Sequence, residues 1–350
     1  MAADALERAP DRPPPAARDR ERLLGVRAAL AVVALTVTIG LPRFAAHTPD
    51  SYGYVQLARY LRGEVGREEL VTPYAYRVLT PFIAAQLPWR DPSLSLAVMN
   101  VLCTIVAYLL FIRYLRLLLP SRADVNLGLL IAVVSFPTFA YSSEVLTDPA
   151  GFLALIAASS LLLEERPYAF SATVSLGILA RDSVVVMVAV FLLYQALRER
   201  RMREPWPWIT SLVVAVPPLV TLLALRRYFS DLPDVTGMPS LHQVWSNLRN
   251  PLRCASVLLT VGPPGLLLVA GWRRRGGAAF AMLPRREMQL LAAVTAVGVL
   301  FGLYSVVAFV MSGRYVWLTY PGLIPLAVVA GRDTFVARRL TTAANALFGR

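Results

Sequence analysis

Residues 93–119 read SLSLAVMNVLCTIVAYLLFIRYLRLLL, and this stretch decides the class of the fold. Its only charged residues are Arg113 and Arg116. A straight helix needs about 20 mainly apolar residues to cross a bilayer, and this stretch is longer. It therefore predicts a membrane-spanning helix.

The composition of the whole chain agrees with this prediction. Of 350 residues, 57% are hydrophobic and only 16% are charged, with a mean hydropathy of +0.56. A soluble domain of this size needs more polar surface, so the composition indicates a polytopic helical membrane protein. The net charge of +13 would indicate nucleic-acid binding in a soluble chain. Here the arginines lie mostly between apolar runs, so we expect membrane lipids and no nucleic acid as partners.

Further apolar runs lie before and after this stretch. They occupy 28–42, 126–141, 149–163, 168–180, 183–197, 207–225, 254–271, 289–311 and 316–330. Three of them contain prolines that are expected to kink or break a helix, namely Pro137, Pro217-Pro218 and Pro263-Pro264. Together the runs predict an all-α polytopic membrane protein with about ten transmembrane helices.

The segment 168–197 has two interpretations. It forms either one long helix, with Arg181 and Asp182 at its centre, or a hairpin that turns at these residues. A charged pair in mid-membrane costs about 3 kcal/mol or more. The turn also places neighbouring arginine-rich loops on one side of the membrane, as the positive-inside rule requires. We therefore predict the hairpin.

The runs predict a single transmembrane domain over 28–331. Residues 1–27 are rich in Pro, Ala and Arg and are predicted to form a disordered cytoplasmic tail, and 332–350 a second cytoplasmic tail. The short loops 198–204 and 272–288 hold nine arginines, which places these loops in the cytoplasm. Both termini are then expected on the cytoplasmic side.

The loop 43–92 is the longest predicted segment on the outer side. Within it, Tyr54, Leu57, Ala58 and Leu61 are spaced to share one helical face, and 76–87 has a similar apolar stripe. Two short amphipathic helices at the water–lipid boundary fit this pattern. They are expected to hold Asp50 and Arg77 near the ends of the spans.

Several stretches resemble a known superfamily. An acidic residue soon after the first span, in a long outer loop, is similar to the layout of the C-type glycosyltransferases. DSYGYVQLARYL (50–61) and TPYAYRVLTPFIAAQLP (72–88) resemble the loop of bacterial members. LTDP (146–149), LARDSVVV (179–186) and SGRYVWLTYPGLIPLA (312–327) resemble later stretches in the same order. The similarity covers most of 28–330, although Arg-Asp-Ser at 181–183 departs from the Arg-Glu-Thr expected there.

The resemblance implies an integral enzyme of the bacterial cytoplasmic membrane. Such an enzyme transfers a sugar, with inversion, from a polyprenyl-phosphate-linked donor to a glycan, lipid or protein acceptor on the outer face. Members differ in their use of metal, so no cofactor is assigned and a divalent metal stays open. The two cysteines and two histidines have no metal-ligand spacing, and no metal ligand is predicted.

Glycosyl transfer needs a base for the acceptor hydroxyl and positive charge for the departing phosphate. The resemblance makes Asp50 the leading base and Asp148 a second site carboxylate. The alternative is structural, because Asp50 precedes the amphipathic stretch and Asp148 precedes Pro149, positions where an Asp commonly caps a helix.

Three arginines are the candidates for holding the phosphate, because a guanidinium binds phosphate oxygens in a bidentate way. They are Arg77, Arg181 and Arg314, each at the outer end of an apolar segment. Tyr54 is a candidate for stacking on a sugar. The alternatives are that the arginines extend to lipid headgroups, that Arg181 pairs with Asp182, and that the tyrosine anchors the loop at the interface.

Two other functions remain possible on the sequence alone. A transporter or flippase of lipid-linked saccharides predicts an inverted repeat and ionisable groups near mid-membrane. A surface-polysaccharide polymerase or ligase would centre its chemistry on a large late outer loop. The charges here cluster at one end of the spans, and only the first half of the chain has the long loop, which favours the transferase.

Overall fold

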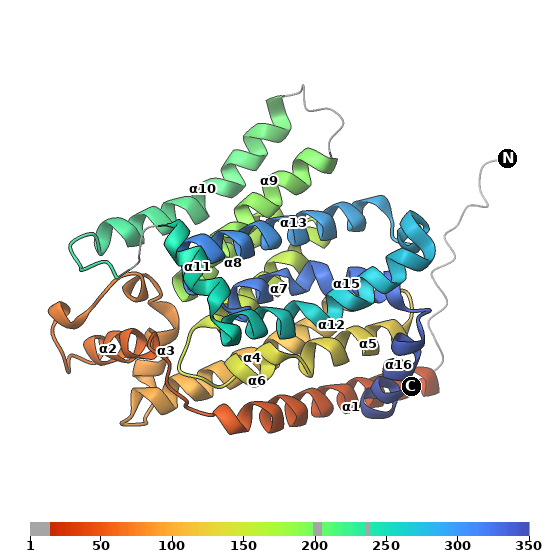
Figure 1. Cartoon of the computed structure of the whole chain (residues 1–350), viewed down its shortest axis with the longest axis horizontal. Helices are drawn as coiled ribbons and strands as arrows, with labels where there is room; N and C mark the ends of the chain where they lie inside the picture. Colours follow the sequence, from red (N-terminus) through yellow and green to blue (C-terminus); the bar gives the residue numbers. More distant parts are fainter. Residues whose placement is uncertain (1–14, 199–204, 236–238, 350) are drawn as a thin grey trace.

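The structure is a computed structural model that describes residues 15–198, 205–235 and 239–349 (Figure 1). Within these ranges the protein is all-α, and its only β-type pairing is an isolated bridge between Thr72 and Asp234. The all-α class predicted from the sequence is confirmed.

The helices follow one another with short connections, apart from the first loop and the segment before α11. In chain order they are α1 (Pro15–Gly40), α2 (Ser51–Leu61), η3 (Tyr74–Tyr76), α3 (Leu79–Gln86), α4 (Pro92–Leu118), α5 (Arg122–Val133), α6 (Phe136–Tyr141), α7 (Asp148–Leu163), α8 (Pro167–Ala180), η4 (Asp182–Val185), α9 (Val186–Arg198), α10 (Pro205–Tyr228), α11 (Leu241–Arg249), α12 (Pro251–Arg275), α13 (Arg285–Ala308), α14 (Gly313–Val316), α15 (Tyr320–Gly331) and α16 (Phe335–Phe348).

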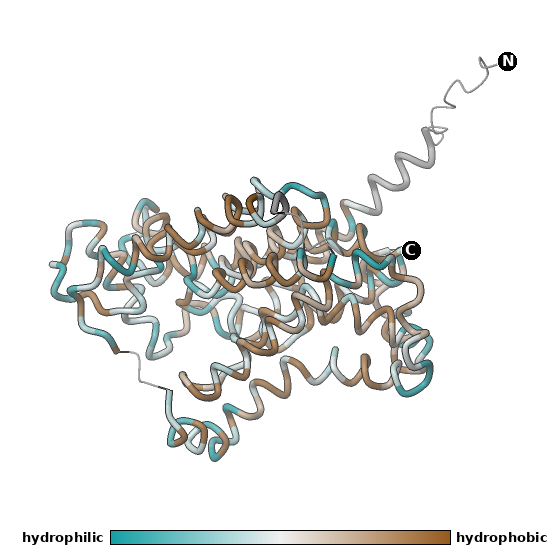
Figure 2. The backbone as a smooth tube through the Cα atoms, turned by 90° about the horizontal axis from the view of Figure 1, so that it is seen from above, coloured by the Kyte–Doolittle hydropathy of each residue, from teal (hydrophilic) through white to brown (hydrophobic). Residues whose placement is uncertain are grey.

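Five helical segments among the described residues are long and apolar enough to cross a membrane. They are Gly25–Arg43, Pro92–Leu118, Trp208–Tyr228, Pro251–Phe280 and Arg285–Ala308. The other predicted spans correspond to shorter helices, such as the 16 residues of α7 and the 12 residues of α15. Figure 2 shows hydrophobic stretches along the helices and hydrophilic segments gathered at the two ends of the bundle.

The helix break expected at Pro137 is present. The run 126–141 is divided between α5, which ends at Val133, and α6, which begins at Phe136. Pro137 accounts for this break, because it has no amide hydrogen to donate to the carbonyl of Val133 and its ring would clash with that carbonyl in a continuous helix. The proline pairs at 217–218 and 263–264, by contrast, lie inside the continuous helices α10 and α12.

The hairpin predicted over 168–197 is present. Arg181 is extended (φ −156°, ψ 115°) and ends α8, after which η4 leads into α9. The chain then returns along its own path, because Arg198 donates to Glu165 at 2.7 Å and the rings of Phe170 and Phe191 lie 5.3 Å apart. The prediction succeeded because the cost of burying two charges in mid-membrane exceeds the cost of a turn.

The first loop covers one end of the bundle (Figure 1). Helix α2 buries Tyr54, Leu57 and Ala58, as its apolar spacing predicts. Leu57 also joins a small apolar cluster with Leu70, Ala75 and Phe229, which ties the loop to the segment after α10. This contact holds the loop over the ends of the helices.

The predicted tails differ from the structure in part. Residues 1–14 lie outside the described residues, and α1 begins at Pro15, within the predicted N-terminal tail. At the other end, α16 occupies most of 332–350 and packs on α1 and α5. Helix α16 is amphipathic, and its 14 residues are too few to cross a membrane.

The orientation predicted from the sequence, with both termini in the cytoplasm, specifies which surfaces an impermeant thiol reagent should reach. Glu68→Cys, in the loop 43–92, is expected to react in intact cells. Ala278→Cys, in the short helix η5 (Gly276–Phe280) beyond the three arginines that end α12, is expected to react only after the membrane is opened. Cys103 and Cys254 are first replaced by Ala, because both are free thiols. Reaction of Ala278→Cys in intact cells with protection of Glu68→Cys would reverse the assigned orientation.

Candidate functional site

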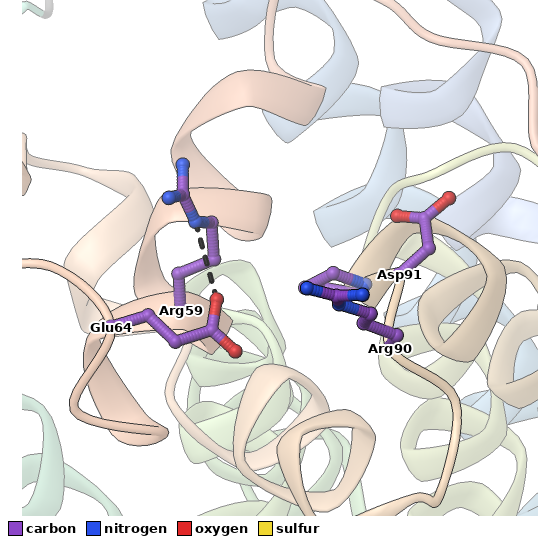
Figure 3. Close-up of a pocket in the computed structure, with 5 residues that line it drawn as sticks. Arg59, Glu64, Arg90 and Asp91 are labelled. Atoms are coloured by element: carbon purple, nitrogen blue, oxygen red, sulfur yellow. Dashed lines mark hydrogen bonds and ion pairs between the residues drawn. The ribbon is translucent and has the colours of Figure 1, made fainter.

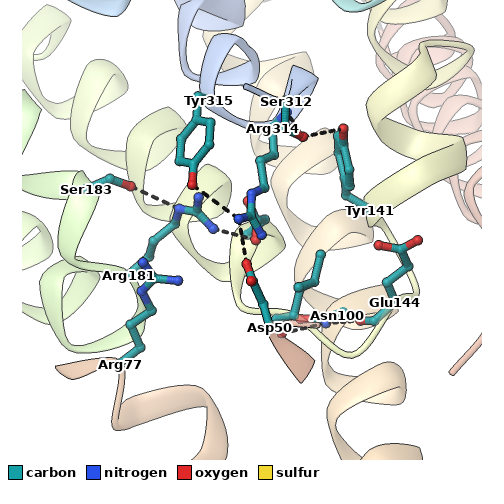
Figure 4. A network of polar contacts seen from close by, with 12 residues as sticks. Asp50, Arg77, Asn100, Tyr141, Glu144, Arg181, Ser183, Ser312, Arg314 and Tyr315 are labelled. Atoms are coloured by element: carbon teal, nitrogen blue, oxygen red, sulfur yellow. Dashed lines mark hydrogen bonds and ion pairs between the residues drawn. The ribbon is translucent and has the colours of Figure 1, made fainter. Parts of the chain in front are cut away.

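The predicted site residues meet at the end of the bundle that the first loop covers, and Figure 4 labels Asp50, Arg77, Arg181 and Arg314 among them. Asp50 directly precedes α2, Arg77 follows η3, and Asp148 begins α7. Arg181 lies between α8 and η4, and Arg314 belongs to α14. Ion pairs and hydrogen bonds link these five segments, which are far apart in the sequence.

Asp50 is held by two partners from other segments. Arg314 lies 2.5 Å from one carboxylate oxygen, and the Tyr74 hydroxyl donates to the other at 2.9 Å. Burial raises the pKa of Asp50, but the charge and hydrogen bond of Arg314 outweigh burial, so the pKa lies below its ordinary value. Asp50 is therefore a carboxylate at neutral pH.

The capping interpretation of Asp50 is not supported. Asp50 occupies the N-cap position of α2, yet its side chain accepts no hydrogen bond from the first turn. Gly53 in that turn permits the actual arrangement, because a Cβ there would lie 2.4 Å from the Tyr74 ring. The glycine lets Tyr74 pack against α2 and reach Asp50.

Asp148 and Arg181 form a second ion pair at the site, more deeply buried than the pair of Asp50 and Arg314. Their side chains are only 2% and 1% exposed, and the Arg181 Nε also donates to the Ser183 hydroxyl at 2.9 Å. Thr147 is the N-cap residue of α7, and no side chain caps this helix. Gly151, one turn into α7, makes room for Arg181, since a Cβ there would lie 2.7 Å from the arginine side chain. Removing one partner of a pair this deeply buried would leave the charge of the other without compensation.

Arg77 pairs with Asp182, the residue that the sequence analysis gave as a possible partner of Arg181. Its Nε donates to Asp182 at 2.9 Å, and a second nitrogen donates to the hydroxyl of the fully buried Tyr54. Burial raises the pKa of Asp182, but Arg77 and Arg181 lower it below its ordinary value. Tyr54 thus binds an arginine at this site, and it is buried rather than placed as an interfacial anchor.

The arginines point into the protein rather than toward lipid headgroups. The Arg77 and Arg314 side chains are 10% and 14% exposed. The charged residues buried within the described ranges are Arg77, Glu144, Asp148 and Arg181, and all four belong to this end of the bundle. This distribution is unlike the mid-membrane charges expected of a transporter.

Three members of the network are not among the predicted site residues. Tyr315 accepts a hydrogen bond from Arg314 at 3.2 Å, and the guanidinium carbons of Arg314 and Arg181 lie 5.1 and 5.9 Å from its ring centroid. Tyr74 holds Asp50. Glu144 pairs with Arg43, and the amide of Asn100 donates to the Glu144 carbonyl at 2.5 Å. Tyr315 adjoins Arg314 in the sequence, but no spacing signal marks Tyr74 or Glu144.

Two arginine nitrogens at the site retain capacity for an anion. Arg314 Nε and Arg181 Nη2 are buried and donate no hydrogen bond to a described residue. A buried donor without an acceptor costs about 1–3 kcal/mol, so an anion bound here would be stabilised. No group of three or more His, Cys, Asp or Glu in the described ranges could hold a metal ion. The charged side chains that the structure brings together at the site are arginines and carboxylates.

A separate pocket opens on the first loop and the start of α4 (Figure 3). It is lined by Arg59, Glu64, Arg90, Asp91 and Pro92. None of the predicted site residues lines it. Arg59 lies 3.4 Å from Glu64, and Asp91 caps α4 through the Ser93 amide, so these charges have local structural partners. We place the candidate site at the buried network and not at this pocket.

Comparison of the chain with known protein families, with curated proteins and with solved structures finds no match. The class defined by fold and site is thus an all-α membrane protein with an arginine–carboxylate network at one end of its bundle. The superfamily resemblance rests on the short motifs quoted above.

Proposed function

We propose that this protein is an inverting membrane glycosyltransferase of the C type that uses a polyprenyl-phosphate-linked sugar. In this proposal the shorter helices α7, α8, α9 and α15, and the pair α5–α6, also cross the membrane, which gives about ten crossings. The site then lies on the outer face of a bacterial cytoplasmic membrane. The acceptor is a glycan, lipid or protein of the cell envelope.

The Asp50–Arg314 pair is the observation that carries the proposal. It places a carboxylate and a guanidinium 2.5 Å apart at the covered end of the bundle, with side chains 20% and 14% exposed. A base and a phosphate-binding cation are the two groups that transfer from a lipid phosphate requires. The deeper Asp148–Arg181 pair, in contrast, is shielded from solvent.

The chemical step uses these groups in order. Asp50 accepts the proton of the acceptor hydroxyl, whose oxygen attacks the anomeric carbon from the face opposite the phosphate. The bond between that carbon and the phosphate oxygen breaks, and polyprenyl phosphate leaves with the bonding electrons. Arg314 and Arg77 stabilise the negative charge of the leaving phosphate.

Binding of the donor phosphate is expected to raise the basicity of Asp50. Asp50 paired with Arg314 is a weak base, because its pKa lies below the ordinary value. A phosphate that takes hydrogen bonds from Arg314 replaces the carboxylate and removes the main influence that lowers the pKa of Asp50. Phosphate binding thereby converts Asp50 into a stronger base beside the reacting sugar.

A deletion strain tests the function directly. We expect its lipid-linked oligosaccharides or cell-wall glycans to lack one sugar, which plasmid-borne wild-type protein restores. Accumulation of a complete lipid-linked saccharide on the inner leaflet would instead indicate a flippase. An unchanged glycan profile and unchanged lipid-linked pools would reject the transferase.

The phosphate-binding role of Arg77 makes a graded prediction. Arg77→Lys keeps the charge but loses the planar fork, so donor use should fall about tenfold, and further with Arg77→Ala. The measurement is the apparent KM for the polyprenyl-phosphate sugar in isolated membranes, with Arg59→Lys as the control at an exposed arginine of the same loop. Equal KM values for wild type and both Arg77 variants would leave Arg77 with a structural role only. The same changes at Arg314 rank the two arginines.

A further inference from the structure

Helix α16 crosses the opposite end of the bundle from the site, at a steep angle to α1 and α5 in Figure 1. Ala337, Ala344 and Phe348 are fully buried against the bundle. The amide of Asn126 donates to Asn345 at 2.8 Å, and Arg27 donates to the carbonyl of Ala346 at 2.9 Å. These contacts fix α16 in place, so it is an ordered part of the fold.

The outward face of α16 carries four large apolar side chains beside the exposed Arg338 and Arg339. Phe335 and Val336 are 62% and 59% exposed, and Leu340 and Leu347 are 37% and 41% exposed. The inward face includes two alanines, so most of the larger apolar side chains point away from the protein. A helix on a water-facing surface has the reverse arrangement. The outward face therefore fits an apolar environment.

The position of α16 identifies that environment. Arg27, which donates a hydrogen bond to the carbonyl of Ala346 near the end of α16, is the third residue of the apolar segment Gly25–Arg43 of α1. Helix α16 thus lies at the level where a membrane-crossing segment begins. That level is the headgroup layer of the bilayer.

The charge of α16 selects the lipid. Arg338 and Arg339 are exposed and form no ion pair with a described residue, and Arg339 covers the ring of Phe335 at 5.2 Å. Asp333 is the only acidic residue of 332–350, and it pairs with Arg275. An apolar face flanked by free arginines is the pattern of a helix that binds anionic membranes.

We propose that α16 is an interfacial helix that binds anionic phospholipids at the end of the bundle opposite the candidate site. The exposed apolar side chains enter the acyl boundary, and Arg338 and Arg339 bind lipid phosphates. This assignment does not depend on the transferase proposal, because it concerns a surface that shares no residue with the site.

Nitroxide depth measurement tests the immersion of α16. In full-length protein with Cys103 and Cys254 replaced by Ala, a label at Val336→Cys should be more accessible to oxygen than to a water-soluble nickel reagent. A label at Ala278→Cys, exposed in η5 beyond the three arginines that end α12, should show the opposite preference. Equal, water-like accessibility at both positions would overturn the proposal.

Lipid selectivity is tested in nanodiscs of phosphatidylglycerol or phosphatidylcholine. Hydrogen exchange of the α16 amides should be slower in phosphatidylglycerol, by up to about fivefold for each arginine at an anionic surface. Arg338→Gln with Arg339→Gln should remove the difference without changing glycan complementation. Equal exchange in both lipids for the wild-type protein would reject anionic selectivity.

Discussion

Asp50→Asn is expected to lower the rate of sugar transfer by about 10²–10⁴-fold, the usual cost of losing a general base. Asn keeps the size of Asp and accepts the hydrogen bond of Tyr74, which is 2.9 Å from Asp50. The variant should therefore accumulate in the membrane at the wild-type level. The measurement is glycan complementation of a deletion strain, followed by initial rates in isolated membranes.

Binding of the donor separates this role from a structural one. Because Asp50 neutralises Arg314 in the resting site, Asp50→Asn leaves Arg314 free for a phosphate. Farnesyl phosphate, a short polyprenyl phosphate, should bind the variant at least as tightly as the wild type. Full complementation by Asp50→Asn at normal abundance would reject Asp50 as the base, and weaker phosphate binding would reject the exchange of carboxylate for phosphate.

The pH dependence of the Asp50–Arg314 pair has a defined sign. A carboxylate whose pKa is lower in the folded than in the unfolded state adds stability above the unfolded value, and that stability is lost as the pH falls through the folded value. Since the pKa of Asp50 lies below the ordinary 3.8, no loss from this pair is expected between pH 5 and 8. Loss of stability from the Asp50–Arg314 pair near neutral pH would contradict the assignment of this ion pair.

Arg181→Met is expected to destabilise the protein by about 3–5 kcal/mol, because it leaves the Asp148 carboxylate buried without its counter-charge. Both side chains are at most 2% exposed, so water cannot replace the arginine. The measurement is thermal unfolding in detergent, with protein abundance in the membrane as a second readout.

The double change Arg181→Met with Asp148→Leu is the matched control. Replacing both charges by apolar groups removes the unpaired carboxylate, so most of the lost stability should return. Transfer activity then separates the two roles of the pair, since a stable double variant without activity assigns it to the reaction. Unchanged stability in Arg181→Met alone would show that Asp148 is not a buried charge.

The candidate residues could be selected from the sequence, but their partners could not. Asp50, Arg77, Asp148, Arg181 and Arg314 all lie at the ends of apolar runs, a local property that motifs and hydropathy report. The pairing of acids with arginines depends on how segments far apart in the sequence pack together. Asp50 and Arg314, for example, form an ion pair although they are 264 residues apart. Tyr74 and Glu144 join the network through such contacts, and their partners Asp50 and Arg43 are likewise decided by the tertiary structure.

The sequence by itself determined the all-α membrane class and the turn at Arg181, because hydrophobicity and the cost of burying charge act along the chain within a few residues. Only the tertiary structure decided that Asp50 pairs with Arg314 instead of capping α2, and that Arg77 rather than Arg181 takes Asp182. It also decided that the C-terminal segment docks as α16. These outcomes depend on packing and on Coulomb energies, which fall with the distance between two charges. The sequence alone does not give these distances.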